Sequence, residues 1–582
     1  MRSMVIIHGI EDAIHCVENT LYTDNILVST HPSVEVFLKE MYGVDCMSLS
    51  SFLRTEECFA FKEKATALID EIVLNLDTHI SPLINSPLDL KMNWFTARYQ
   101  YRVKHQCLSY MCFIHSLRMG IERHNVDYIK SYKYVCNSLM DTSSDISYIL
   151  EIFFENHEFT TIENEYSPAG NENRSFRAFA ATLRSNIIEY LRHIGGIKSG
   201  RKKTLFCDLI YNLHFLKDTL PEKYNMLTLR DVQDEMDNKK VRSLLKNGVN
   251  YNSLLDFEKC YRSPEFAQLE GLILKDIKED FICNSDVFLG TALAMRELHK
   301  KHPISLGISG LPRVDKVGAI AFEYLRSENI DVVIGQHGYS YGELYNTWHF
   351  DLDFDLCSYF FSYGFTFDDL QRLYPERNVT CEIVPIGYNS PLRRTPREEI
   401  DLLFPMTFSS SFFHGGFNKI LPHLLLERQI ALLEFLDSLK DLNIVVKPLA
   451  GSNFDNCAVL PVLKRLKNIR TIQDVTLTRF LEKYKPRAVL VEFPSTPLIE
   501  VIGLDTEIFF MGDDMFPYDG KILEMLRKRV YFFSDVKDVT EHIERFFQGK
   551  LEKKRDTEYC SNYLRTENVK ENALRKIEKI IE

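Results

Sequence analysis

Short apolar runs alternate with helical stretches in the first ninety residues. The runs at 4–7 and 25–29 each end in a polar loop, and apolar positions at helical spacing follow the second run. A strand, a short loop and a helix in repetition are typical of parallel α/β architecture.

The pattern changes over residues 91–260, where long helical stretches dominate. In residues 94–124, for example, apolar side chains recur at three- and four-residue spacing, and glycine and proline are rare. That spacing indicates amphipathic helices. We interpret residues 91–260 as a large helical insertion in the amino-terminal half.

Strand–helix alternation then returns and continues through most of the remaining chain. We predict that residues 1–90 and 261–390 form one Rossmann-like, acceptor-side domain. Residues 398–545 form a second Rossmann-like domain, which binds the donor, and residues 546–582 form a helical tail. Ligands bind beyond the carboxyl ends of parallel strands, so two such domains predict a site in the cleft between them.

Composition narrows the class of protein. The chain has 582 residues and a formal net charge of -12, which argues against a nucleic-acid partner. Its 13 cysteines are scattered without a CxxC pair, so we expect reduced thiols and no structural zinc. No apolar stretch approaches the roughly 20 residues that cross a bilayer. We therefore expect a soluble, cytoplasmic protein, with peripheral contact at the inner membrane left open.

The densest candidate motif lies at residues 336–338, directly after a predicted buried strand. It delivers Gln336, His337 and Gly338 to the carboxyl end of that strand. A histidine there can act as a base or donate to a phosphate. The alternative is a histidine that the backbone satisfies, with the glycines serving only the turn.

A second motif spans residues 487–504, where a strand leads through Ser495 and Thr496 into a helix that carries Glu500. Free N–H groups and hydroxyls at a helix start can bind a phosphate, and Glu500 can accept hydrogen bonds from a ribose. Lys447 ends another strand of the same half and can place a cation near that phosphate. A plain helix cap and a surface lysine are the alternatives.

Two further sets are candidates with weaker sequence signals. Ser409 and Ser410 lie in a polar loop whose backbone N–H groups could cradle a phosphate. His8 and His31 follow the first two predicted strands, and either is an alternative acceptor-side base. The chain contains neither a GxGxxG fingerprint nor a P-loop, which argues against a dinucleotide enzyme or a P-loop NTPase.

Together, the QHGYSYGE loop at 336–343 and the FPSTPLIE segment at 493–500 resemble GT-B-fold glycosyltransferases of bacterial surface-carbohydrate biosynthesis, of the capsule and lipopolysaccharide O-antigen type. More distantly, they are similar to capsule Kdo transferases, polysialyltransferases and CDP-glycerol glycerophosphotransferases. The resemblance covers residues from about 282 to 545.

This resemblance implies a GT-B-like fold and a nucleotide-activated donor bound mainly by the second half. Ser495 and Thr496 match the phosphate-binding hydroxyl pair of the family, and Glu500 matches its acidic residue. The loop at 336–338 matches the one that faces the donor. Members that use CMP-sugars carry a His-Pro pair where this chain has Lys447 and Pro448, which argues against a CMP donor.

We therefore expect a glycosyltransferase that moves a sugar from a nucleotide-activated donor to an acceptor hydroxyl on a surface glycan or glycolipid. His337 is preferred over His8 and His31 as the base, and no metal or other cofactor is expected. Two alternatives stay open: a polyol-phosphate transferase that uses a CDP-linked donor, and a non-catalytic scaffold of a polysaccharide assembly complex.

Overall fold

The computed structural model places most of the chain. The residues that it describes are 2–134, 146–162, 202–209, 211–236, 267–313, 315–338, 341–345, 348, 350–389, 398–407, 421–452, 457–512 and 517–582.

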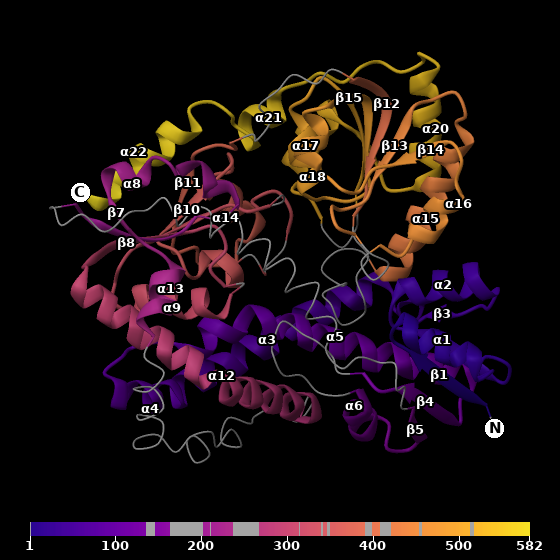
Figure 1. Cartoon of the computed structure of the whole chain (residues 1–582), viewed down its shortest axis with the longest axis horizontal. Helices are drawn as coiled ribbons and strands as arrows, with labels where there is room; N and C mark the ends of the chain where they lie inside the picture. Colours follow the sequence, from indigo (N-terminus) through magenta and orange to yellow (C-terminus); the bar gives the residue numbers. More distant parts are fainter. Residues whose placement is uncertain are drawn as a thin grey trace.

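The described residues form three parallel sheets, each covered by helices (Figure 1). The first sheet has the strand order β3-β2-β1-β4-β5. Its strands are β1 (Ser3–Ile7), β2 (Asn25–Ser29), β3 (Met47–Ser48), β4 (Tyr128–Tyr132) and β5 (Glu158–Ile162). The apolar residues of β1 and β2 are largely buried because both faces of a parallel sheet are covered, whereas β4 and β5 are more polar. Helices α1 (Ile10–Glu18) and α2 (Pro32–Tyr42) follow β1 and β2, as the sequence predicts.

The middle sheet has six parallel strands in the order β11-β10-β9-β8-β6-β7. Its strands are β6 (Thr204–Asp208), β7 (Asn225–Leu227), β8 (Ile304–Ser309), β9 (Val332–Gly335), β10 (Tyr359–Ser362) and β11 (Glu382–Pro385). Helix α13 (Lys316–Ser327) connects β8 to β9 and is buried along most of its length. The order reverses between β6 and β8, as in doubly wound folds.

The third sheet has the order β14-β13-β12-β15-β16-β17, which is 3-2-1-4-5-6 in chain order and thus the Rossmann arrangement. Its strands are β12 (Glu398–Pro405), β13 (Ile444–Lys447), β14 (Ile469–Thr471), β15 (Tyr484–Val491), β16 (Glu507–Met511) and β17 (Tyr531–Phe533). Its helices include α15 (Pro422–Ser438), α17 (Leu477–Leu481), α18 (Thr496–Ile502), α19 (Gly520–Arg529) and α20 (Val536–Phe547). The middle and third sheets are both Rossmann-like, and together they give the GT-B-like α/β class that we expected.

The prediction that residues 1–90 and 261–390 share one sheet is wrong. The strands at the amino terminus pair with β4 and β5, not with β8 to β11. The segment 91–260 is also not purely helical, because it supplies β4 to β7 to two different sheets. Helical periodicity in residues 94–124 is real, but the short strands after it carry too few residues to stand out by pattern.

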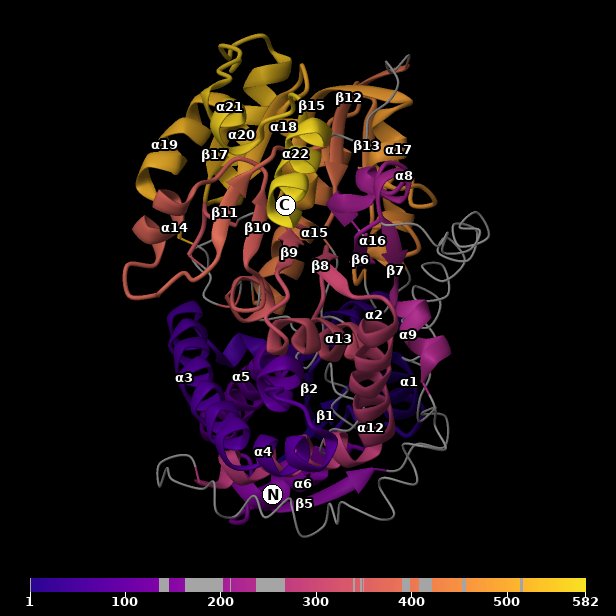
Figure 2. The same ribbon diagram turned by 90° about the vertical axis from the view of Figure 1, so that its left-hand side faces the viewer.

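Two long helices connect the first sheet to the middle sheet. They are α3 (Thr55–His79) and α5 (Trp94–His124), which pack along each other beside α12 (Ala267–Lys301) (Figure 2). Gly120 in α5 lies against Met4 of the first sheet. At the other end of α5, the Asn93 backbone N–H donates to Glu323 of α13 at 3.1 Å.

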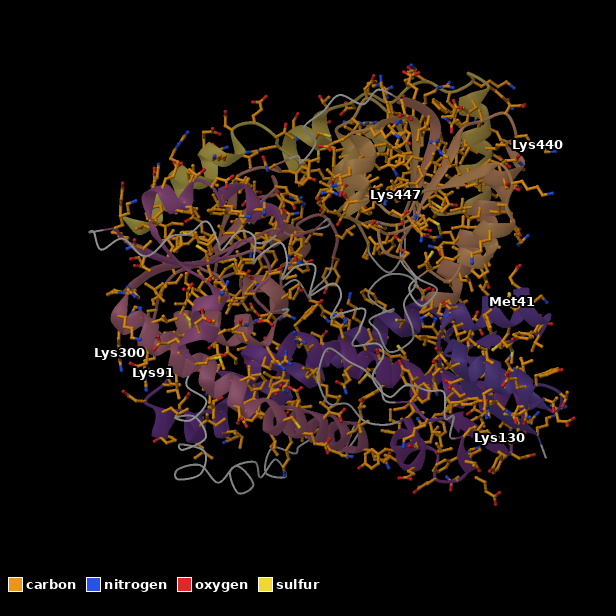
Figure 3. All side chains as sticks on the ribbon, viewed as in Figure 1. Met41, Lys91, Lys130, Lys300, Lys440 and Lys447 are labelled. Carbon is orange, nitrogen blue, oxygen red and sulfur yellow. The ribbon has the colours of Figure 1, made fainter. Side chains whose placement is uncertain are left out.

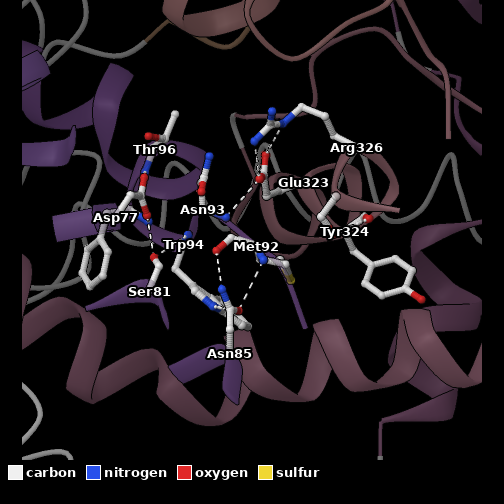
Figure 4. A network of polar contacts seen from close by, with 12 residues as sticks. Asp77, Ser81, Asn85, Met92, Asn93, Trp94, Thr96, Glu323, Tyr324 and Arg326 are labelled. Atoms are coloured by element: carbon white, nitrogen blue, oxygen red, sulfur yellow. Dashed lines mark hydrogen bonds and ion pairs between the residues drawn. The ribbon is translucent and has the colours of Figure 1, made fainter. Parts of the chain in front are cut away.

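A buried carboxylate fixes the angle between these helices (Figure 4). Asp77 near the end of α3 accepts the backbone N–H groups of Phe95 and Thr96 at 2.9 and 2.8 Å. These donors open α5 and have no partner within the helix, so Asp77 satisfies them. The short helix α4 (Ser81–Asn85) adds the Ser81 hydroxyl to the same carboxylate.

The carboxyl-terminal tail leaves the third sheet and returns to the middle one (Figure 2). It forms α21 (Glu558–Tyr563) and α22 (Val569–Ile581), in agreement with the predicted helical tail. Val569, Ala573 and Ile577 of α22 are buried in the apolar core of the middle sheet. The two Rossmann-like parts are therefore connected twice by the chain.

Candidate active site

The predicted loop at 336–338 lies at the carboxyl end of β9 and is held by the side chain of Gln336. The Gln336 carbonyl oxygen accepts the Tyr363 backbone N–H at 2.8 Å, and its amide nitrogen donates to the Gly338 carbonyl at 2.9 Å. Gln336 is almost completely buried. Both ends of the Gln336 side-chain amide thus bond to the protein and shape the loop. A contact between Gln336 and the nucleotide-activated donor stays a prediction.

His337 lies beside a buried tyrosine and a buried aspartate. The Tyr341 hydroxyl is 3.0 Å from His337 Nε2 and 3.1 Å from Nδ1, and it donates a short hydrogen bond to Asp353 Oδ2. Asp353 Oδ2 is also 3.6 Å from His337 Nδ1. The His337 side chain keeps 17% of its surface exposed, so a reactant can reach it.

Burial sets the charge states of this group. It lowers the pKa of His337 to about 4, so the imidazole is neutral at pH 7 and can accept a proton. Burial raises the pKa of Asp353 to about 7, although the Tyr341 hydrogen bond and the positive charge of Arg313 oppose the rise.

The glycines of the motif differ in what they provide. Among the described residues, no atom lies within 4 Å of the position that a Gly338 Cβ would take, so those residues leave space beside the loop there. Gly342 has φ +70, and a Cβ on it would lie 2.4 Å from Phe365 Cγ. Gly342 is therefore required by the turn itself.

Two tyrosine rings extend from the His337 loop toward the third sheet. Tyr363 follows β10, and Tyr388 follows β11 after Gly387. Their ring centroids are 5.0 Å apart at an interplanar angle of 69°. Burial raises the pKa of Tyr388, and the negative charge of Glu500 raises it further, which places Glu500 near this ring.

On the third sheet, Lys447 and Glu500 influence each other's charge. Lys447 ends β13 and is almost fully buried, with its ammonium donating to the Pro448 carbonyl at 3.1 Å (Figure 3). Burial lowers the pKa of Lys447 and the negative charge of Glu500 opposes this. Burial raises the pKa of Glu500 to about 7, opposed by the Thr478 hydroxyl at 3.4 Å and by Lys447.

Ser495 and Thr496 open α18, next to the point where the strand order of the third sheet reverses. The Ser495 hydroxyl donates to the Phe493 carbonyl at 3.1 Å, so it does not cap the helix as the sequence suggested. Thr496 is exposed. Between the carboxyl ends of β12 and β15, Glu492 accepts the Thr407 backbone N–H and, at 2.9 Å, the Gln429 amide. The predicted Ser409 and Ser410 lie outside the described residues.

The structure therefore brings the two main motifs together. Gln336, next to His337, accepts the Tyr363 backbone N–H, and the Tyr363 ring packs on Tyr388. Tyr388 lies within electrostatic reach of Glu500, and Glu500 in turn of Lys447. We call this arrangement the interlobe site. Its members are His337, Tyr341, Asp353, Tyr363, Tyr388, Lys447 and Glu500.

His8 and His31 belong to the first sheet instead, apart from the sheet that carries His337. His8 is buried, its ring nitrogens lie 2.9 Å from Thr30 Oγ1 and 3.2 Å from Ser131 Oγ, and burial lowers its pKa to about 3. His31 Nδ1 accepts the Ser33 backbone N–H at 3.1 Å and caps α2. These contacts match structural roles.

A cavity of about 390 Å³ lies elsewhere on the middle sheet. Its lining includes Val332, Ser358, Tyr359 and Glu382, at the amino ends of β9 to β11. Catalytic loops in parallel sheets lie at the opposite ends, so this cavity is separate from the interlobe site. Within the described residues there is no cluster of three or more His, Cys, Asp or Glu side chains suited to a metal ion.

Sequence reasoning missed Tyr341, Asp353, Tyr363 and Tyr388. Tyr388 follows directly on a strand that the apolar pattern predicts, so its position after the strand was an available signal. Asp353 lies in a single π-helical turn, Phe350–Phe354, and no pattern in the sequence indicates that turn. Such turns often occur at functional sites.

None of the helices in the described part of the chain combines the length and apolar character needed to span a bilayer. No protein-family model matches the chain, and no curated protein matches it.

Solved structures show a distant likeness. A glycosyltransferase from Rickettsia africae ESF-5 has a TM-score of 0.36 and 12% identity, covering 66% of this chain and 100% of that one. The UDP-GlcNAc 2-epimerase of Methanocaldococcus jannaschii, in complex with UDP-GlcNAc and UDP, has a TM-score of 0.37 and 11% identity over 65% of this chain and 99% of that one. The glycosyltransferase SnogD of Streptomyces nogalater has a TM-score of 0.28 and 14% identity over 66% and 96%. Scores this low assign neither an activity nor a substrate to the chain.

Proposed function

We propose that the chain is a glycosyltransferase that moves a sugar from a nucleotide-activated donor to a hydroxyl of a surface glycan or glycolipid. One observation carries the proposal. A neutral, partly exposed histidine on one Rossmann-like sheet is connected through Tyr363 and Tyr388 to a half-buried glutamate on the next sheet, whose charge acts on a buried lysine. The acceptor class follows from the resemblance of the two motifs.

The third sheet provides the donor side. Lys447 supplies a positive charge for the nucleotide phosphates, and Ser495 and Thr496 add hydroxyls at the start of α18. Glu500 lies one turn further and accepts hydrogen bonds from the ribose. A buried cation stabilises charge on a leaving phosphate strongly because little water screens it.

The middle sheet provides the base. His337 takes the proton of the acceptor hydroxyl, whose oxygen forms a bond to the anomeric carbon of the sugar. The bond from that carbon to the phosphate oxygen breaks, and the nucleotide leaves with the electron pair. Lys447 stabilises that charge, so we expect turnover to persist in the presence of EDTA.

A thermal-shift screen tests the donor assignment. A ligand that binds only the native state raises the melting temperature. We expect a shift with one of CMP, CDP, UDP or GDP or their sugars, and the smallest shift with CMP. In Lys447→Met that shift should largely disappear, whereas Lys440→Met, an exposed lysine of the same sheet region, should retain it (Figure 3).

The remaining alternatives have distinct outcomes in the same assays. Transfer of a polyol phosphate from a CDP-linked donor gives a product of different mass. No shift with any nucleotide, in a protein that otherwise melts cooperatively, contradicts the enzyme and favours a scaffold of a polysaccharide assembly complex.

A further inference from the structure

To act as a base, the His337 imidazole must become charged at a buried position. Burial disfavours the charged form of a histidine, so the proton that His337 gains must be stabilised by a nearby group. Asp353 is the carboxylate that approaches the ring, with Oδ2 3.6 Å from Nδ1. Asp353 is fully buried, and its Oδ1 has no hydrogen-bond partner in the described structure.

Tyr341 lies between the two groups and connects them. Its hydroxyl donates to Asp353 Oδ2, and its oxygen lies 3.1 Å from His337 Nδ1 and 3.0 Å from Nε2, so it can accept a hydrogen bond from either ring nitrogen. Asp353 approaches the ring on the Nδ1 side, which favours the hydrogen bond from Nδ1. The Tyr341 ring is stacked on Phe360 with centroids 5.5 Å apart, and Phe354 contacts it edge-on. The hydroxyl is therefore held in place by packing.

Among the described residues, further charged and titratable groups near this arrangement come from the loop after β8, from α5 and from the loop after β10. Arg313 follows β8 and its positive charge favours the ionised form of Asp353. Tyr101 of α5 and Tyr363 after β10 lie near Tyr341. Asp353 is thus the carboxylate that can stabilise a positive charge on the His337 imidazole.

We propose that Tyr341 and Asp353 are positioning residues that hold His337 as its Nδ1–H tautomer and stabilise the imidazolium formed during transfer. This inference rests on the proposed function only where it says that His337 takes its proton from the acceptor hydroxyl. In the step, the acceptor O–H proton moves to His337 Nε2. Nδ1–H donates to the Tyr341 oxygen, and the Tyr341 hydroxyl donates to the Asp353 carboxylate.

The tautomer can be measured without any substrate. Nitrogen-15 chemical shifts of the His337 ring, assigned with His337→Gln, should show Nδ1–H at pH 7 in the wild-type chain. Free imidazole favours Nε2–H, so Tyr341→Phe and Asp353→Asn should each move His337 toward Nε2–H. Tyr110→Phe removes a similar buried bond, from Tyr110 to Asp276 at 2.8 Å, and should leave His337 unchanged.

An Nε2–H ring in the wild-type chain overturns the proposal, and this readout needs neither Tyr341→Phe nor Asp353→Asn to fold. Retention of Nδ1–H in both Tyr341→Phe and Asp353→Asn overturns it as well. A failure of every nucleotide to bind contradicts the glycosyltransferase assignment but leaves the tautomer result standing, so the two failures are distinguishable.

Kinetics separate positioning from a merely structural role. Asp353→Asn should lower kcat roughly 10- to 100-fold, a part of the about 10²–10⁴-fold that a general base supplies. The KM for the donor should stay constant. Ionisation of Asp353 predicts a rise of wild-type kcat around pH 7, and this rise should vanish in Asp353→Asn. A raised KM with unchanged kcat contradicts the role.

Discussion

At the scale of single residues, the site depends on groups whose charge is set by burial. His337 is neutral at pH 7, and burial lowers the pKa of Lys447. Burial raises the pKa of Glu500 to about 7. Each is satisfied by a specific neighbour, such as Tyr341 or Thr478. The chemistry therefore belongs to pairs of residues more than to single ones.

The base assignment predicts a sharp mutational effect. His337→Ala should lower kcat about 10²- to 10⁴-fold because a general base contributes that much to proton transfer. Nucleotide binding, measured by calorimetry, should persist, since Lys447 and Glu500 are on the other sheet. His31→Ala serves as the control, and wild-type turnover in His337→Ala would remove His337 from the mechanism.

A backbone prediction concerns Gly342. Its left-handed φ and the nearby Phe365 ring leave no room for a side chain, so Gly342→Ala should reduce the free energy of unfolding by about 1–3 kcal/mol. Gly338→Ala, where the space is open, should change it by less than about 0.5 kcal/mol. Urea denaturation of both variants checks the contrast, and equal losses would contradict it.

At the scale of elements, the carboxyl-terminal tail holds the two tyrosines of the site. The Arg565 backbone N–H donates to the Tyr363 carbonyl at 3.2 Å, and the Arg565 carbonyl accepts the Tyr388 backbone N–H at 2.6 Å. Helix α22 then packs into the core of the middle sheet. The tail is thus a structural support of the interlobe site.

Loosening α22 should therefore weaken both stability and ligand binding. Ile577→Asn places a polar group in the core and should cost about 2–4 kcal/mol in urea denaturation. The thermal shift with nucleotide should shrink as Tyr388 loses its support. Lys579→Asn, exposed on the same helix, is the matched control. A full nucleotide shift in Ile577→Asn would show that the tail does not support the site.

At the scale of the whole molecule, three sheets are joined into one body. Ser50, beside the first sheet, lies 2.9 Å from His423 Nδ1 at the start of α15, which covers the third sheet. Helices α3 and α5 connect the first sheet to the middle one. Buried titratable groups are distributed over all three parts.

These groups predict how stability depends on pH. Burial raises the pKa of four carboxyl groups to about 7: Glu35, Asp208, Asp353 and Glu500. Burial lowers the pKa of four histidines to about 3 or 4: His8, His105, His337 and His423. Carboxyl groups with a raised pKa stabilise the fold at low pH and lose that effect as pH rises through about 7. Histidines with a lowered pKa destabilise it as pH falls below about 6.5.

The two effects nearly cancel between about pH 4.5 and 6.5, so the free energy of unfolding should be nearly constant there. It should fall slightly as pH rises from about 6.5 to 7.5 and fall more steeply as pH drops below about 4.5. Urea denaturation at about pH 3.5, 5.5 and 8 measures this, and Glu500→Gln should lose less stability at the alkaline end. A steady rise through pH 8 would contradict the assignment.

Pattern and spacing along the chain are enough to predict many of the local elements and the two main motifs. Buried strands such as β9, β12 and β15 read as apolar runs, and His337, Lys447, Ser495 and Glu500 follow strands in sequence, where parallel α/β folds place ligands. Such features depend on neighbours along the chain, so pattern and spacing predict them.

Which strands share a sheet and which residues meet depends on packing between distant parts of the chain. The amino-terminal strands form their own sheet because they pair with β4 and β5, and strand pairing is a long-range choice that periodicity does not encode. The same holds for Asp353 beside His337 and for Tyr388 near Glu500. Their charge states arise from burial, which exists only once the separate parts of the chain have packed together.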